Sequence, residues 1–316
     1  MLLDCCVIYF AVNGIITYIA RARQNKYSST THLFLMKVVF SERCLKYDNN
    51  PESPDRVKAA HNFLKGEGYV FIEPTPASHE DLSRVHLAKY IERIMMRNFW
   101  DSDSPPYENI YEYAKLSAGG AILAAKVSGF SLMRPPGHHA GRSGIALGGS
   151  SLGFCYFNNI AVAVRSLGKN TLIVDIDGHH GNGTQDIFLG DERVRFISLH
   201  RSPHYPGTGF RSEANCLNFP LSRNAGDRLY LKTLEKALSQ INVKDIEVVA
   251  ISAGFDAHKN DPQASLSLSS QCYREIGRKI GSLGLPTFAA LEGGYVPRDL
   301  GRNIHELLQG FEEKLT

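Results

Sequence analysis

Thr171-Leu172-Ile173-Val174-Asp175-Ile176-Asp177-Gly178-His179-His180 places two carboxylates and two imidazoles within six positions at the end of an apolar run. Residues 171–176 are rich in β-branched side chains and lack helical periodicity, so they predict a buried strand of a parallel sheet. Side chains alternate in direction along a strand, and Asp175, Asp177 and His179 can therefore project to one side. The carboxyl end of this strand is the first candidate for a functional site.

The donors on this segment favour a divalent metal, because carboxylate and imidazole groups gather where an open α/β sheet usually binds its ligand. The same residue types also cap helices and form turns, and Gly181-Asn182-Gly183 suits a turn equally well. The segment alone leaves both interpretations open. The rest of the chain has to decide between them.

The composition of the 316-residue chain is that of a globular protein, with 43% hydrophobic and 21% charged residues. Such a chain can bury one large α/β core, and a single catalytic domain is the simplest division. The formal net charge is +3, with Lys and Arg spread along the chain. No direct nucleic-acid binding is predicted, because a dedicated surface would cluster these charges.

The cysteines form no CxxC pair and have no regular spacing. This pattern favours small buried side chains in a reducing compartment over a disulfide framework or a cysteine zinc site. The six are Cys5, Cys6, Cys44, Cys155, Cys216 and Cys272.

Residues 2–20 have nearly the length of a membrane span, and 15 of these 19 residues are apolar. No Lys or Arg precedes them, unlike a secretory signal, and the basic residues at 21, 23 and 26 would keep the following domain in the cytoplasm. A membrane anchor is one interpretation, and membrane contact is expected only in that case. The other is a start at Met36, which opens a plausible first strand. We expect an N-terminal extension at residues 1–35 and a cytoplasmic catalytic domain at residues 36–316.

From Met36 onward, short apolar runs alternate with amphipathic segments. This order predicts a single α/β domain with a mainly parallel sheet flanked by helices on both faces. Strands are predicted over 37–40, 130–133, 171–176, 194–199, 248–252 and 287–291. Helices are predicted over 54–66, 80–96, 109–128, 158–167, 229–241 and 271–283, with a Gly/Ser-rich loop over 140–153.

Each predicted strand after residue 130 ends in polar or glycine-rich residues, which accidental turns would not supply so consistently. Asp256 ends the segment Ser252-Ala253-Gly254-Phe255-Asp256 and is the best third metal ligand beside Asp177 and His179. Three protein ligands leave coordination positions open, as in a catalytic site. Zinc is the expected ion, and Fe²⁺ or Mn²⁺ would accept the same ligands.

His138 and His139 follow another predicted strand and can both face one cavity. Asp175 and Asn182 lie where each could receive an imidazole N–H, and a carboxylate favours the charged imidazole more strongly than an amide does. Two histidines in such different environments suit an electrostatic helper and a proton-shuttling base. The alternative is a pair of structural turn histidines.

Tyr295 follows Gly293-Gly294 at the end of the last predicted strand. Flexible glycines would let its phenol reach the metal and hold a developing oxyanion. The same three residues are also a common loop sequence, so this motif alone is weak.

Six blocks together resemble the zinc-dependent histone deacetylase family, which includes acetylpolyamine amidohydrolases and acetoin-utilisation proteins. They are Arg134 to His139 (RPPGHH), Gly153 to Asn159 (GFCYFNN), Asp175 to Gly183 (DIDGHHGNG), Tyr205 to Gly209 (YPGTG), Ala253 to Asp256 (AGFD) and Glu292 to Tyr295 (EGGY). The match runs in order from about residue 37 to about residue 310 and implies the arginase-like α/β fold. Asn182, with GHHA and EGGY, places the resemblance closer to the class II and amidohydrolase-like branch.

The resemblance implies a role for each matching residue. Asp177, His179 and Asp256 would bind zinc, with His138 paired to Asp175 and His139 to Asn182. His139 would act as general base and acid, and Tyr295 would polarise the carbonyl. The residues implied to bind substrate are Gly153, Phe154 and Tyr205 in a narrow tunnel, Asp103 at its rim and Arg56 at its floor. A structural K⁺ would fall on Asp175, Asp177, His179, Ser198 and Leu199.

The function implied is metal-dependent removal of acetyl or other acyl groups from lysine side chains of proteins, with release of acetate. The first alternative is deacetylation of acetylpolyamines or other small acetylated amines. The alternative in another class is a non-catalytic relative that binds acyl-lysine. The expected partner is an acetylated protein or a small acetylamine, and the sequence leaves the native substrate, the metal in the cell and the oligomeric state open.

Overall fold

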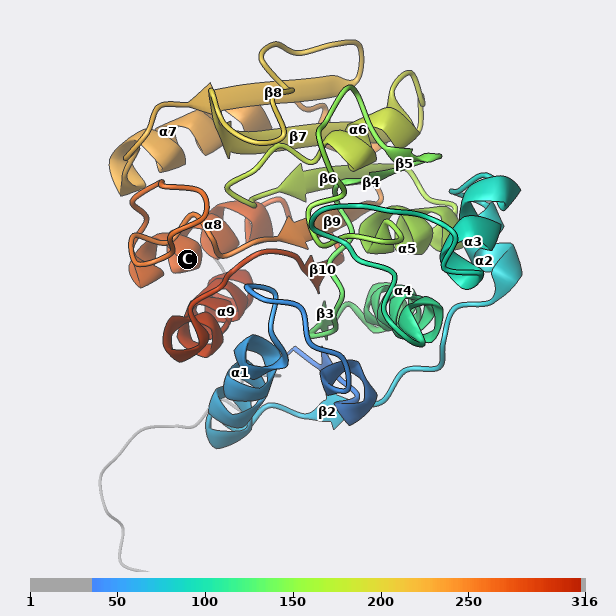
Figure 1. The fold of residues 1–316 in the computed structure, drawn as a ribbon. Coiled ribbons are helices and arrows are strands. Elements are labelled where there is room, and N and C mark those ends of the chain that lie inside the picture. The colour runs from blue at the N-terminus through green and yellow to red at the C-terminus, as the bar shows by residue number, and fades with distance from the viewer. Residues whose placement is uncertain (1–35, 314–316) are drawn as a thin grey trace, which may run out of the picture. The chain divides into compact units, whose positions relative to one another are not determined.

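The computed structural model describes residues 36–313. Their main feature is an eight-stranded sheet in the order β2-β1-β3-β10-β9-β6-β7-β8, in which every neighbouring pair is parallel (Figure 1). The strands are β1 (Val38–Val39), β2 (Phe71–Ile72), β3 (Phe130–Ser131), β6 (Thr171–Asp175), β7 (Val194–Arg201), β8 (Cys216–Leu221), β9 (Val248–Ala253) and β10 (Thr287–Leu291). The predicted mainly parallel α/β sheet is confirmed.

Helices cover both faces of the sheet. One face packs against α1 (Pro54–Gly66), α7 (Asp227–Leu238), α8 (Ser270–Gly281) and α9 (Pro297–Glu312). The other packs against α2 (His79–Ser83), α3 (Ala88–Met95), α4 (Ile110–Val127), α5 (Asn159–Leu167) and α6 (Asn182–Phe188). Short 3₁₀ helices lie at Glu42–Leu45 and Val243–Asp245.

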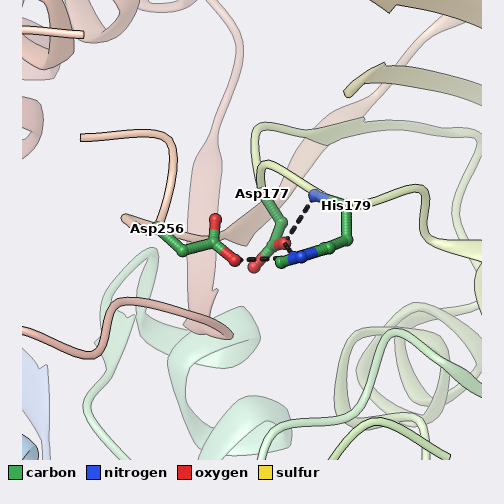
Figure 2. A group of neighbouring side chains, drawn as sticks. All are labelled: Asp177, His179 and Asp256. Carbon is green, nitrogen blue, oxygen red and sulfur yellow. Dashed lines mark hydrogen bonds and ion pairs between the residues drawn. The ribbon is translucent and has the colours of Figure 1, made fainter. Parts of the chain in front are cut away.

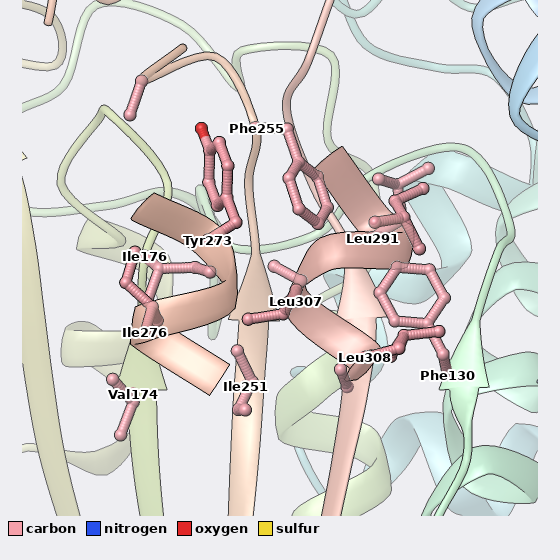
Figure 3. Close-up of a cluster of buried hydrophobic side chains, with 14 of the residues drawn as sticks. Phe130, Val174, Ile176, Ile251, Phe255, Tyr273, Ile276, Leu291, Leu307 and Leu308 are labelled. Atoms are coloured by element: carbon pink, nitrogen blue, oxygen red, sulfur yellow. The ribbon is translucent and has the colours of Figure 1, made fainter. Parts of the chain in front are cut away.

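The alternation of apolar side chains along β6 explains this layering. Leu172 and Val174 belong to the hydrophobic cluster on the α8 and α9 side, whereas Ile173 belongs to the cluster on the opposite side. Figure 3 shows Val174 among the strand residues that face α8 and α9, where Ile276 and Leu307 contribute to the same cluster. Burial on both faces makes β6 a central strand.

Side-chain caps define where several helices begin. Asn158 accepts a hydrogen bond from the Ala161 N–H at 3.0 Å at the start of α5, and Ser269 accepts one from the Cys272 N–H at 3.2 Å at the start of α8. Pro54 occupies the first turn of α1, where a missing N–H costs nothing. These local signals explain why the predicted starts lie within two residues of the observed ones.

The prediction of one helix over 80–96 is wrong. Two helices, α2 and α3, occupy this stretch, because the Leu87 N–H donates to the Arg142 carbonyl at 2.9 Å instead of continuing the helix. Arg142 lies in the predicted 140–153 loop, which contains the short antiparallel hairpin β4 (Ala140–Gly141) and β5 (Gly144–Ile145). This contact between distant segments has no signature in the local sequence.

Among residues 36–313, no helix is both long and apolar enough to cross a membrane. The apolar segment at residues 2–20 and the rest of the predicted extension at residues 1–35 lie outside the described residues.

Candidate functional site

The order of the central strands brings four distant sequence segments together. β3, β10, β9 and β6 are adjacent in the sheet, although they come from residues near 130, 290, 250 and 173 of the chain. All four are parallel, so their carboxyl ends meet at one edge. The segments after these strands carry the predicted histidine pair, Tyr295, Asp256 and the Asp177-His179 pair.

Asp177, His179 and Asp256 form a buried cluster at this edge (Figure 2). One potential ligand atom from each lies within 4.8 Å of the others. The His179 Nδ1 atom lies 2.8 Å from Asp256 Oδ2 and 3.1 Å from Asp177 Oδ1. The remaining carboxylate oxygens accept backbone hydrogen bonds, from Gly293 N–H to Asp177 at 2.9 Å and from Gly178 N–H to Asp256 at 2.7 Å. The structure thus brings together the three residues that the sequence predicts as metal ligands.

The surroundings of the triad fit a cation. Burial lowers the pKa of His179, but Asp256 and Asp177 outweigh it and raise that pKa to about 10. Two buried carboxylates therefore favour positive charge here, which a divalent ion would supply. Asp256 Oδ2 is buried and, apart from its 2.8 Å contact with His179 Nδ1, has no polar partner among the described residues. A side chain at Gly293 would place its Cβ 2.6 Å from both carboxylates, so only glycine leaves this space open.

The two histidines after β3 have different partners. His138 Nδ1 lies 2.9 Å from Asp175 Oδ2, and His139 Nδ1 lies 2.7 Å from Asn182 Oδ1. The imidazole rings are 4.0 Å apart between centroids. The structure therefore brings together both pairs that were expected from the sequence.

These partners separate the protonation behaviour of the two imidazoles. Burial lowers the pKa of His138, but Asp175 and then Asp177 outweigh it, so that pKa lies well above its usual value. Burial also lowers the pKa of His139, and the nearby positive charges of His138 and His179 lower it further. These opposite pKa shifts favour a charged His138 and a neutral His139. A neutral imidazole beside a charged one suits proton transfer at His139.

A cavity of about 170 Å³ opens onto His139 and onto His179 of the triad. Its lining residues are Asp103, His139, Gly153, Phe154, His179, His204, Tyr205, Gln263 and Tyr295. The Phe154 and Tyr295 rings are 5.6 Å apart, and the Tyr205 ring lies 5.0 Å from that of His139. Aromatic walls of this kind suit a chain of methylene groups.

Tyr295 reaches the cavity from the loop after β10. Burial raises the pKa of its phenol well above the usual value, so the hydroxyl remains a hydrogen-bond donor. Its backbone N–H donates to Asp261 at 2.6 Å, and the Arg56 guanidinium lies 5.0 Å from the centre of its ring. These contacts with Asp261 and Arg56 fix the position of the loop.

Asp103 and Arg56 take different positions relative to the cavity. Asp103 lies in the lining and accepts a hydrogen bond from the Ser151 hydroxyl. The Tyr205 hydroxyl donates a hydrogen bond to the backbone carbonyl of Ser151 at 2.9 Å. Arg56 is fully buried behind the Tyr295 loop and is absent from the described lining. Its predicted role at the floor of the site stays a prediction.

The residues expected to hold a monovalent cation lie on two neighbouring strands and the loop that follows the first. Asp175 and Ser198 are register partners on β6 and β7. Ser198 Oγ lies 2.9 Å from His200 Nδ1, and Leu199 is buried next to it. The cation itself stays a prediction.

Several residues of the site were not found from the sequence. His204 and Gln263 line the cavity, with the His204 Nε2 atom 2.7 Å from the Gln263 carbonyl. His180, which had no role, is buried between Thr208 Oγ1 at 2.7 Å and Gln185 Oε1 at 2.9 Å. The available signal for His180 was its position next to His179, and for His204 its position next to the YPGTG block. Gln263 had none, because it lies in an irregular loop.

Comparison with known proteins adds an independent line of observation. The family model of the histone deacetylase domain matches residues 50–311. A probable deacetylase from Archaeoglobus fulgidus is 35% identical over 295 residues, which cover 82% of this chain and 80% of the relative. Acetylpolyamine amidohydrolase 2 from Pseudomonas aeruginosa is 38% identical over 212 residues, which cover 62% and 60%. The crystal structure of the HDA15 HD domain matches with a TM-score of 0.79 and 32% identity, over 86% of this chain and 90% of that one.

Proposed function

Because the chain belongs to the histone deacetylase family, we propose that it is a zinc-dependent deacetylase that removes acetyl groups from lysine side chains of proteins. The observation that carries the proposal is the division of the two histidines beside the triad. His139 lines the narrow cavity and has a neutral partner in Asn182, whereas His138 lies beside it, with ring centroids 4.0 Å apart, and has the carboxylate of Asp175 as its partner. This arrangement provides electrostatic stabilisation and proton transfer at the same reacting bond.

Asp177, His179 and Asp256 would hold the zinc ion, and Fe²⁺ or Mn²⁺ would accept the same ligands. A bound zinc ion would polarise the acetyl carbonyl and lower the pKa of water at the site from about 15.7 towards about 7. K⁺ is proposed at Asp175, Asp177, His179, Ser198 and Leu199, as a structural ion.

The side chains account for the movement of protons. His139, which is neutral, takes a proton from the attacking water through Nε2 while Asn182 holds its Nδ1 side. The Tyr295 hydroxyl donates to the carbonyl oxygen as negative charge develops there. His139 then gives the proton to the departing nitrogen, and the C–N bond breaks to leave a free amine and acetate. His138 stays charged beside Asp175 throughout and stabilises the negative charge.

The cavity favours an acetyl-lysine side chain over a polycation. Asp103 is the only carboxylate among the described lining residues, and the Ser151 hydroxyl already donates to it. An acetylated polyamine keeps further positive charges along its chain, and carboxylates would bind these charges through charge-assisted hydrogen bonds. Gly153, Phe154 and Tyr205 would instead enclose the lysine methylenes, with Asp103 at the rim.

Deacetylation of small acetylated amines is the second candidate, because an acetylpolyamine amidohydrolase is among the similar proteins. The two are distinguished by kcat/KM on acetyl-lysine peptides and on acetylated polyamines, each with and without a chelator. Higher kcat/KM on the peptides, abolished by the chelator and restored by Zn²⁺, would support the proposal. Binding of an acetyl-lysine peptide without turnover at any metal loading would contradict it and would favour a non-catalytic relative.

A further inference from the structure

Glu292 is a fully buried carboxylate to which neither the sequence nor the proposed reaction gives a role. It directly follows β10. Its Oε2 atom accepts hydrogen bonds from the backbone N–H of Gly137 at 2.7 Å and of His138 at 3.1 Å. Its Oε1 atom is buried and has no partner among the described residues. Burying a carboxylate is costly, so this position needs an explanation beyond packing.

The two hydrogen bonds fix the turn that presents the histidine pair. Gly137 and His138 come immediately before His139, and their N–H groups have no other acceptor in the described structure. A side chain at Gly137 would collide with the backbone of Phe157 and Asn159, so these two residues also pack tightly against the turn. Without the carboxylate, two buried N–H groups would be unpaired.

The backbone of Glu292 belongs to the loop that carries Tyr295. The Arg56 guanidinium donates to the carbonyls of Glu292 and Gly294, the second at 2.7 Å. One residue therefore joins the histidine turn, through its side chain, to the Tyr295 loop, through its backbone. The two segments that it joins are 155 positions apart in the sequence.

The charge of Glu292 is also placed to act on the pair. Burial raises its pKa to about 7, although the charge of His138 favours the ionised form. His138 in turn has Asp175, Asp177 and Glu292 as negative neighbours. Hydrogen bonding and charge therefore have to be separated by experiment.

We propose that Glu292 is a positioning residue for deacetylation, whose carboxylate holds the His138-His139 turn against the Tyr295 loop. The inference rests on the proposed function. In this proposal Glu292 sets the distance between His139, which transfers the proton, and Tyr295, which binds the carbonyl oxygen. Misplacement of reacting groups by about 1 Å can cost on the order of 10²-fold in rate.

Two substitutions separate hydrogen bonding from charge. Glu292→Gln keeps an oxygen that accepts from Gly137 and His138 but removes the charge, and Glu292→Ala removes both. We expect Glu292→Ala to lower kcat by on the order of 10²-fold with little change in KM or metal content. Glu292→Gln should recover most of that loss. Asp227→Ala is the matched control, because Asp227 accepts two hydrogen bonds from Ser269, at 2.8 and 2.6 Å, outside the site. It should lower the melting temperature without changing kcat.

A second measurement does not depend on turnover. Hydrogen exchange of a peptide covering residues 134–141 should be faster in Glu292→Ala and unchanged in Glu292→Gln, while β6 amides stay protected in both. If Glu292→Ala does not fold, Glu292→Asp replaces it, because the shorter side chain draws the carboxylate away from Gly137.

Three results would overturn the inference: an unchanged kcat in the alanine variant, a loss that follows metal content, or equal loss in both variants with unchanged exchange. A parent protein that hydrolyses no acetylated amine would instead contradict the proposed function. The exchange measurement would then still decide whether Glu292 holds the turn.

Discussion

The Asn182 side-chain oxygen lies 2.7 Å from Nδ1 of His139, so the proposed base has a neutral partner. The neighbouring His138 has a carboxylate in the equivalent position. An amide orients an imidazole without stabilising its charged form as strongly as a carboxylate does. Burial and the nearby charges of His138 and His179 hold the pKa of His139 low, and an amide partner opposes that shift less than a carboxylate would, so His139 can accept a proton.

Replacing Asn182 with Asp should shift the pH dependence of activity. Burial lowers the pKa of His139, so the acidic limb of kcat/KM in the parent should lie below the usual histidine pKa of about 6.5. The new carboxylate favours the protonated imidazole, which cannot act as a base, and the limb should move to higher pH. An acidic limb at the same pH in both proteins, with equal metal content, would show that His139 is not the titrating base.

Tyr295→Phe should lower kcat by on the order of 10²-fold or more, because an oxyanion donor contributes mainly in the transition state. The ring and its contact with Phe154 would remain. Tyr69→Phe is a control for loss of a phenol elsewhere, since Tyr69 bonds to His305 outside the cavity. Steady-state kinetics with metal analysis tests this, and near-unchanged turnover of metal-loaded Tyr295→Phe would remove Tyr295 from the mechanism.

Asp256→Asn should abolish metal binding and activity together, because one of the two buried carboxylates that favour a cation loses its charge. Ligands that bind only the folded state stabilise it, by about 2.7 kcal/mol at a concentration 100 times Kd. A chelator should therefore lower the melting temperature of the parent and of Asp227→Asn, but not that of Asp256→Asn. Full metal content in dialysed Asp256→Asn would contradict this assignment.

The central part of the fold could be predicted because its signals are local. β10 was predicted at its observed residues, and β6 and β9 within one residue, since each is a run of apolar residues buried on both faces. β8 was missed because an edge strand that contains Asn218 and Pro220 lacks such a run. α6 was missed because it begins inside the glycine-rich segment that also predicts a turn.

The site also contains residues that could be predicted from the sequence and contacts that could not. Asp177, His179 and Asp256 follow strand ends, and parallel strands bring such residues to one edge, so their clustering could be expected. The partner of a buried group depends instead on contacts between distant segments. Glu52 and Arg134 are 82 positions apart, and nothing in either local sequence shows that they form an ion pair.

That ion pair belongs to a buried cluster whose loss should be measured as stability. Glu52 lies 2.8 Å from Arg56 and 2.7 Å from Arg134, and all three side chains are at most 1% exposed. Glu52→Gln would leave two guanidinium groups without a counter-charge and should lower the free energy of unfolding by about 3–5 kcal/mol. The exposed pair of Glu80 and Arg84, also in contact at 2.9 Å, is the control. Glu80→Gln should cost less than about 1 kcal/mol in denaturant unfolding, and equal costs would contradict the distinction.

His180 connects the loop that carries Asp177 and His179 to the wall of the cavity. Burial lowers its pKa to about 4, so the imidazole is neutral near pH 7 and has one donor and one acceptor nitrogen. The Gln185 side-chain oxygen can only accept, which makes Nε2 the donor and leaves Nδ1 to accept from the Thr208 hydroxyl. Thr208 lies in the segment 205–209 that begins with the wall residue Tyr205.

We therefore expect His180→Ala and Thr208→Val to raise KM for an acetyl-lysine peptide more than they lower kcat. Both remove the same hydrogen bond, so the double variant should show a coupling energy of about 0.5–3 kcal/mol in kcat/KM instead of additive losses. Metal content is measured in each variant, because His180 is adjacent to the ligand His179. Ser270→Ala, which removes a hydroxyl 3.4 Å from His258 outside the cavity, serves as the control for loss of such a contact. Additive effects, or a fall in kcat at constant KM, would show that His180 does not act through the cavity wall.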